Sequence, residues 1–245
     1  MVDLAGRRAL VCGGTSGIGA AAAEALRDRG AAVTILARSA SGAAALACDL
    51  EDTEALTIII KKEIGANGAF EILVNNSAGP PSGPLLEAAP ADFEKAMRRH
   101  LHASHTLVQL LLPGMRDAGY GRIINVISTS VKEPIPGLGV SNTVRGAMAA
   151  WAKTLAKELP PGITINSILP GFTATQRLEE LKQTLATQRG VSPAEVEAAW
   201  LATVPEGRLA QPSELGAVIA FLASPAAGFV RGVALPVDGG RLASI

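Results

Sequence analysis

The chain has 245 residues, of which 48% are hydrophobic and only 3% aromatic, and its 22 basic side chains balance its 22 acidic ones. Zero net charge argues against nucleic-acid binding, which needs a basic surface to displace counterions, and gives no reason for adhesion to an anionic membrane. A core rich in aliphatic and poor in aromatic side chains is typical of a parallel sheet covered by helices on both faces.

Nothing in the chain predicts a targeting or membrane segment. The N-terminus runs directly into a predicted strand, without the features of a signal peptide. The longest apolar stretch, residues 217–230, is interrupted by Ser224 and Pro225 and is too short to span a bilayer. We therefore expect a cytoplasmic protein that does not bind membranes.

Short β-branched runs alternate with longer amphipathic or Ala-rich segments, which predicts repeated strand–helix–strand units. Strands are predicted over residues 8–12, 32–37, 46–48, 72–75, 122–127, 164–168 and 233–237. Helices are predicted over residues 16–29, 54–64, 93–115, 142–159 and 212–223. The pattern indicates one α/β domain over residues 1–245, a Rossmann fold with a doubly wound parallel sheet of about seven strands.

Two segments depart from the alternation. Between the second and third strands there is too little chain for the usual crossover helix, so we expect that helix to be absent or reduced to a turn. Residues 173–204 are richer in Glu, Gln and Thr, and an insertion there lies outside the carboxyl ends of the strands, where such sheets bind ligands. We predict that this insertion is a mobile substrate lid. Its Trp200 could close over substrate, although packing is the commoner role.

The strongest local signal is the run Gly-Gly-Thr-Ser-Gly-Ile-Gly at residues 13–19, between the first strand and the first helix. Glycines allow a tight turn and a close backbone approach, so that the helix N-terminus can hold a pyrophosphate through its free N–H groups and its dipole. The position of the run after an opening strand favours a dinucleotide site over an ordinary glycine-rich turn.

Several motifs in order resemble the short-chain dehydrogenase/reductase family. They are the glycine spacing 13, 17 and 19; Asn-Asn-Ser-Ala-Gly at 75–79, one residue longer than the family's Asn-Asn-Ala-Gly; Pro170-Gly171 followed by Thr173 and Thr175; and Gly207-Arg208-Leu209 with Pro212 and the Val-Asp-Gly-Gly run at 237–240. The last group is similar to 3-oxoacyl-(acyl-carrier-protein) reductases.

The resemblance implies a nicotinamide dinucleotide cofactor and the residues that hold it. Those residues are Gly13, Thr15, Ser16, Gly17, Ile18, Gly19, Arg38, Asp49, Leu50, Asn75, Ser77, Ala78, Gly79, Arg145, Pro170, Gly171, Thr173 and Thr175. Family members that use NAD usually place an acidic residue at the end of the second strand, where this chain has Ala37. The guanidinium of Arg38 suits a 2′-phosphate, which predicts NADP(H) in preference to NAD(H); the alternative is that Arg38 is a solvated loop residue.

The resemblance also locates the catalytic positions, and three of the four are altered. Family members reduce ketones with Ser, Tyr, Lys and Asn. Here Ser128 keeps the serine position, while Ser141, Arg145 and His100 stand at the other three. Arg145 could hold the nicotinamide ribose, but a guanidinium does not give up a proton. The single tyrosine, Tyr120, precedes the fifth strand and lies at the wrong place.

His100 is the candidate for the missing proton donor, because histidine titrates near neutral pH. It could act as a general acid, directly or through a water in the space that the tyrosine ring would fill; equally, it could be a hydrogen-bonded structural residue beside an inactive site. No metal site is expected from the three histidines of this helix, which have the wrong spacing. Lys132 and Glu133 are expected as solvated charges in the loop that borders the substrate cleft.

Two functions from different classes follow. The first is an NADP(H)-dependent oxidoreductase that reduces a carbonyl, either 3-oxoacyl-thioester-like or another ketone. The second is a catalytically impaired dinucleotide-binding protein that works as a sensor or assembly partner. A non-redox lyase or isomerase is a third possibility. By analogy with the family, we expect a homodimer or homotetramer.

Overall fold

The predicted strands and helices recur in the computed structural model, which describes residues 3–244. The strands are β1 (Arg8–Cys12), β2 (Ala32–Ala37), β3 (Ala45–Ala47), β4 (Ile72–Asn75), β5 (Gly121–Val126), β6 (Ile163–Pro170) and β7 (Ala234–Val237). All pair in parallel in one sheet of order β3-β2-β1-β4-β5-β6-β7. The predicted Rossmann-type α/β class is therefore confirmed.

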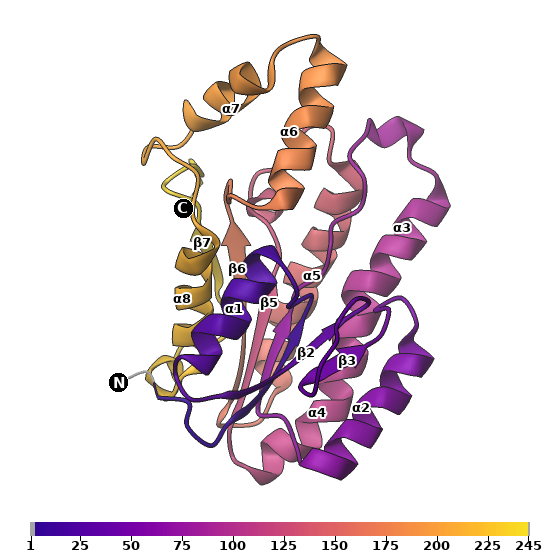
Figure 1. The fold of residues 1–245 in the computed structure, drawn as a ribbon, viewed down its shortest axis with the longest axis vertical. Coiled ribbons are helices and arrows are strands. Elements are labelled where there is room, and N and C mark those ends of the chain that lie inside the picture. The colour runs from indigo at the N-terminus through magenta and orange to yellow at the C-terminus, as the bar shows by residue number, and fades with distance from the viewer. Residues whose placement is uncertain (1–2, 245) are drawn as a thin grey trace.

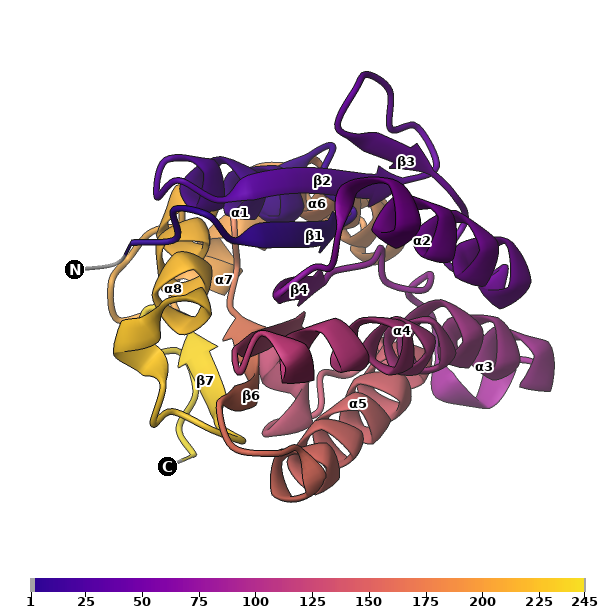
Figure 2. The ribbon, with the colours of Figure 1, turned by 90° about the horizontal axis from the view of Figure 1, so that it is seen from below.

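Helices cover both faces of the sheet, because successive side chains of each strand point to opposite sides. Ala9 and Val11 of β1 join the cluster that packs under α1 (Gly17–Arg27) and α8 (Pro212–Ala223). Leu10 and Cys12 join the opposite cluster, under α2 (Thr53–Asn67), α4 (Ala103–Asp117) and α5 (Gly139–Glu158). Figure 2 shows the two helical layers on either side of the strands.

The connection from β2 to β3 contains only turns and bends over residues 38–44, which confirms the expected loss of the crossover helix. The parallel pairing is possible because β3 is short and starts beside Ile35, two residues before β2 ends. To start β3, the chain therefore has to run back along β2 only from Ala37 to the level of Ile35. Most of this turn is exposed, and it leaves the flank beside Arg38 uncovered.

The predicted single helix over 93–115 is wrong in detail. The chain forms α3 (Pro90–Met97), then a π-helical turn, η2 (Arg98–His102), and then α4. A π turn adds a residue to one helical turn and so changes which side chains face inward. Within this turn His100 is buried while His102 is exposed.

The insertion after β6 contains two helices, α6 (Gln176–Arg189) and α7 (Pro193–Leu201). They stand above the carboxyl ends of the strands (Figure 1). Each begins at a hydroxyl side chain that accepts a hydrogen bond from the helix backbone, Thr175 for α6 and Ser192 for α7. No helix within residues 3–244 is long and apolar enough to cross a bilayer.

Candidate active site

The sheet order reverses between β1 and β4, which places a crevice at the carboxyl ends of these two strands. The glycine run follows β1, and the turn at residues 75–79 follows β4. Asn76 joins them, since its Nδ2 donates to the carbonyl oxygens of Cys12 and Gly13, 3.3 Å away in each case. Asn76 belongs to the motif quoted above but was missing from the predicted contacts; its place in that motif was the available signal.

The glycine run has the geometry that a pyrophosphate requires. Gly13 and Gly17 adopt positive φ angles of 61° and 53°. A Cβ on Gly19 would lie 2.1 Å from the carbonyl oxygen of Gly13, so the turn closes only with glycine there. Helix α1 has no side-chain cap at Ser16 and no acidic residue in its first turn. Its first N–H groups therefore remain available to an anionic ligand, and these residues fit the phosphates of a dinucleotide.

The predicted adenosine contacts lie around the same crevice. Thr15, Ser16 and Arg38 are exposed at its rim, and Leu50 is half-buried. Asp49 follows β3, and its Oδ1 accepts from the backbone N–H of Glu51 at 3.0 Å. This bond holds the carboxylate in place and leaves its second oxygen for a ligand.

The loop after β6 connects the lid to the glycine run. Pro170 ends β6, and Gly171 lies so close to Asp238 that a Cβ would be 2.7 Å from the Asp238 Cα. Thr173 is buried and donates to the carbonyl oxygen of Gly171 at 3.2 Å. Thr175 caps α6, and its Cγ2 would lie 3.3 Å from a Cβ on Gly17. The first turn of the lid therefore lies against the predicted phosphate site.

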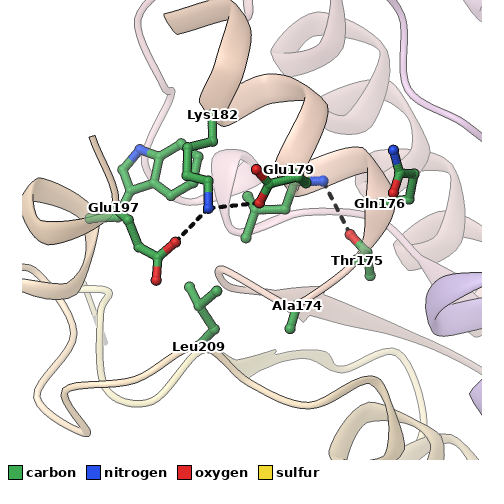
Figure 3. Close-up of a pocket in the computed structure, with 9 residues that line it drawn as sticks. Ala174, Thr175, Gln176, Glu179, Lys182, Glu197 and Leu209 are labelled. Atoms are coloured by element: carbon green, nitrogen blue, oxygen red, sulfur yellow. Dashed lines mark hydrogen bonds and ion pairs between the residues drawn. The ribbon is translucent and has the colours of Figure 1, made fainter. Parts of the chain in front are cut away.

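A cavity of about 230 Å³ lies within the lid, away from Ser128. Lys182 of α6 crosses it and pairs with Glu179 of its own helix and with Glu197 of α7, both at 2.7 Å (Figure 3). The cavity is lined by Ala174, Thr175, Gln176, Leu178, Glu179, Lys182, Glu197, Trp200 and Leu209. Thr175 is the only predicted site residue among them. We assign this cavity to the packing of the two lid helices and not to the chemistry.

The predicted catalytic residues gather at the ends of β4 and β5. Ser128 follows β5, and its hydroxyl accepts from the N–H of Ser130 at 3.1 Å. Ser141 lies half-buried in the first turn of α5, one turn before Arg145 and therefore on the same helical face. The buried Arg145 donates from Nη1 to the Val126 carbonyl oxygen at 2.8 Å. A Cβ on Gly79 would lie 3.7 Å from Arg145 Nη2, so the guanidinium lies between the two strand ends.

His100 pairs with Ser77, and both are departures from the motifs of the resembling family. The Ser77 hydroxyl and His100 Nδ1 are hydrogen bonded at 2.7 Å, which ties η2 to the turn after β4. Burial lowers the pKa of His100 to about 2, with further lowering by the charges of Arg145 and Arg99. Burial also lowers the pKa of Arg145, to about 10, which leaves the guanidinium charged at neutral pH.

The lowered pKa bears on the two interpretations of His100 given above. A side chain with a pKa near 2 is a neutral imidazole at any working pH and carries no extra proton to give to a substrate. The hydrogen bond between Ser77 and His100 and the burial of the imidazole fit the structural role, and the general-acid role stays a prediction.

His100 predicts a measurable acid sensitivity of folding. In the unfolded chain it binds a proton below pH 6.5, but in the folded protein only near pH 2, so stability falls as the pH drops through this window. The slope is about 1.4 kcal/mol per pH unit for one proton. We expect His100→Asn to lose less stability than the wild type between pH 6 and pH 4.5, measured by urea unfolding. Parallel losses in both proteins would contradict a neutral His100.

Of the six buried side-chain polar atoms without a partner among the described residues, four lie on elements around this crevice. Within the described chain they include Asn75 Oδ1, His100 Nε2, Ser130 Oγ and Asn142 Oδ1, from β4, η2, η3 (Thr129–Val131) and α5. Such atoms are rare in folded proteins unless a ligand or water satisfies them. Their elements all border the crevice, which supports a ligand site there.

Two further predictions have clear outcomes. Tyr120 is far from the site, as expected: its hydroxyl donates to the Ala223 carbonyl oxygen at the end of α8, and its ring lies between Arg7 and Arg122. Glu133 is half-exposed, in keeping with the predicted solvated charge, and it also binds the C-terminal segment. Glu133 Oε1 accepts from the backbone N–H groups of Ala243 and Ser244, both at 2.9 Å, because the C-terminal segment folds back over this loop.

The known proteins that this chain resembles in sequence and in structure include reductases. The profile of the family described as enoyl-(acyl carrier protein) reductase matches residues 13–241. The 3-oxoacyl-(acyl-carrier-protein) reductase of Vibrio cholerae is 33% identical, with 98% of each chain covered. The structure of L-sorbose reductase from Gluconobacter frateurii, complexed with NADPH and L-sorbose, is 28% identical with a TM-score of 0.92, covering 100% of this chain and 99% of that one. A solved protein from Beutenbergia cavernae with bound NADP, described as an NAD(P)-dependent gluconate 5-dehydrogenase, is 29% identical with a TM-score of 0.87, covering 99% of both chains.

Proposed function

The chain belongs to the short-chain dehydrogenase/reductase family, and from this premise we propose that it is an NADP(H)-dependent oxidoreductase that reduces a carbonyl group. The observation that carries the proposal is the joint geometry of the crevice. A glycine turn and an uncapped helix N-terminus suited to phosphates lie beside the buried Arg145 and unpartnered polar atoms at the ends of β4 and β5. When bound, the dinucleotide supplies a hydride to the carbonyl carbon.

The chain's own residues orient the substrate and handle charge. We assign Ser128 to the substrate oxygen and Arg145 to the nicotinamide ribose. Arg145 stays protonated and His100 neutral, so neither is a suitable proton donor at neutral pH. The proton then comes from water, oriented by the hydroxyls of Ser128 and Ser141. A reductase of this kind works without a tyrosine and is slower than one that has it.

The preference for NADP(H) rests on Arg38. It is exposed directly after β2, follows Ala37 where an acidic residue would repel a 2′-phosphate, and borders the open turn to β3. The solved relatives above that were crystallised with NADPH or NADP support the same choice. We expect Arg38→Gln to weaken NADPH binding about 10-fold or more, the worth of one charge-assisted contact, with NADH little changed. Equal dissociation constants of the wild type for NADPH and NADH would remove the preference.

The test of the proposed function is oxidation of NADPH, followed at 340 nm, with 3-oxoacyl thioesters, 1,2-diketones, quinones and simple ketones. We expect turnover with at least one class, and loss of at least about 100-fold in Ser128→Ala, because Ser128 touches the reacting oxygen. Tight NADPH binding without turnover on any compound would replace this proposal by the impaired dinucleotide-binding protein. Failure to bind NADPH would overturn both.

A further inference from the structure

The C-terminal segment crosses from the end of β7 to the loop that carries Ser128. Its path is set by Asp238, whose Oδ1 accepts from the N–H of Gly240 at 3.1 Å and whose Oδ2 accepts from the N–H of Leu242 at 2.9 Å. Asp238 is itself held against Gly171, where the N–H of Gly171 donates to the Val237 carbonyl oxygen at 3.0 Å. This turn fixes the direction of the residue between the two bonded amides, Arg241.

Arg241 contacts the loop that follows β5 and the loop that follows β6. Its Nη1 donates to the Thr129 hydroxyl at 3.3 Å, next to Ser128, and its guanidinium carbon lies 4.8 Å from the centre of the Phe172 ring. Its Nε is buried and has no partner among the described residues, while the side chain as a whole is half-buried. A guanidinium over an aromatic ring is attracted by the electrons of the ring face, so the contact favours one placement of the side chain.

Phe172, in turn, contacts a residue of the lid. Its ring stacks on Trp200 of α7, with the ring centres 4.9 Å apart and the planes 16° from parallel. Trp200 therefore packs against the base of the lid, and the contact accounts for the indole without any substrate. The result is a continuous row of side chains, Thr129–Arg241–Phe172–Trp200, from the Ser128 loop to the lid.

The end of the segment is anchored to the same loop. Glu133 holds the N–H groups of Ala243 and Ser244, as described above, so the backbone on the far side of Arg241 is also fixed. Arg241 thus has one bonded amide before it, that of Gly240, and three after it, those of Leu242, Ala243 and Ser244. It acts as a rigid connector.

We propose that Arg241 is a positioning residue that couples the lid to the Ser128 loop, so that the placement of α7 and the orientation of Ser128 depend on each other. The coupling joins the loop after β5, which carries Ser128, to the loop after β6 and α7. Its importance for catalysis rests on the proposed function, but the coupling can be measured without turnover.

Trp200 reports the coupling directly. The chain has two tryptophans, so Trp151→Phe leaves Trp200 as the only one. In this background we would measure the emission maximum and the acrylamide quenching constant. We expect Arg241→Gln to raise the quenching constant about twofold or more, because the ring stack loses the group that confines it. Arg189→Gln, at the exposed end of α6, is the matched control and should leave Trp200 unchanged.

Thr129→Val is the decisive variant. It keeps the shape of Thr129 and removes only the hydroxyl that accepts from Arg241. If the coupling exists, Thr129→Val also raises the quenching constant of Trp200. The double variant should then have the same quenching constant as Arg241→Gln alone. An unchanged Trp200 in Thr129→Val would overturn the proposal, and this variant also serves if Arg241→Gln does not fold.

The same proteins separate this inference from the proposed function. Energy transfer from Trp200 to NADPH shows whether the cofactor binds. Absence of binding in all of them would contradict the proposed function while the quenching result stands. Where a carbonyl is turned over, Arg241→Gln should raise its KM more than it changes the NADPH dissociation constant, with partial rescue by Arg241→Lys, which restores the charge over Phe172. An equal fold-increase in the KM and in the NADPH dissociation constant would show that Arg241 has only a structural role.

Discussion

Ketone reduction is expected to rise by about 10²–10⁴-fold when Ser141→Tyr and Arg145→Lys are combined, because a positioned general acid contributes that much to a proton transfer. Ser141 is half-buried in the first turn of α5, and position 145 lies one turn later on the same face. A lysine at 145 would lower the pKa of the new tyrosine by its charge, which the ammonium group carries as a compact point charge. The measurement is kcat/KM for a simple ketone with NADPH.

The control for this experiment is Arg145→Lys alone, which changes the cation without supplying an acid. This single variant should not raise kcat/KM, since the chain still lacks the tyrosine hydroxyl whose pKa the lysine would lower. If the double variant binds NADPH normally and gains nothing, the absence of tyrosine is not what limits the wild type. The substrate oxygen would then have to lie elsewhere than beside Ser128.

Loss of NADPH affinity by at least about 100-fold is expected for Gly19→Ala, because the phosphates lose charge-assisted hydrogen bonds to the displaced turn, each worth about 1.5–3 kcal/mol. The new Cβ would lie 2.1 Å from the Gly13 carbonyl oxygen and 2.7 Å from Asn76 Nδ2. Relief of these contacts has to move the glycine turn away from the end of β4. The measurements are the NADPH dissociation constant and a thermal melt, since the same clash lowers stability.

Gly65→Ala is the matched control. Gly65 lies in α2, and a Cβ there would meet nothing within 4 Å. The substitution should leave NADPH binding unchanged and stabilise the protein by up to about 1 kcal/mol, because glycine costs conformational entropy in a helix. Wild-type affinity in Gly19→Ala would show that the dinucleotide does not use this turn.

The local sequence pattern was sufficient to predict the helices and strands whose bounds are set by adjacent residues. The predicted bounds of β1, β2, β4 and α8 agree with the structure, since each is an apolar run closed by glycine, polar or proline residues. The missing helix between β2 and β3 was also predictable, because the number of residues alone excludes it. The π-helical turn at η2 was not, since it differs from an α-helical turn by one hydrogen-bond step.

The role of His100 shows why side-chain chemistry was harder to predict. Its position in the sequence suggested a proton donor, and histidine's ordinary pKa allowed that. The structure buries it beside Arg145 and pairs it with Ser77, and burial lowers its pKa. A pKa depends on what surrounds the group in space, and Arg145 and Ser77 lie far from His100 in the sequence.

The sequence by itself determined the class of fold, the place of the dinucleotide crevice and the family, because periodic burial and glycine spacing are properties of adjacent residues. Only the tertiary structure decided that Glu133 binds the C-terminal segment and that Arg241 lies between Thr129 and Phe172, more than 60 residues away in each case. Such contacts form because parallel strands bring their carboxyl ends to one edge of the sheet, where loops distant in sequence meet.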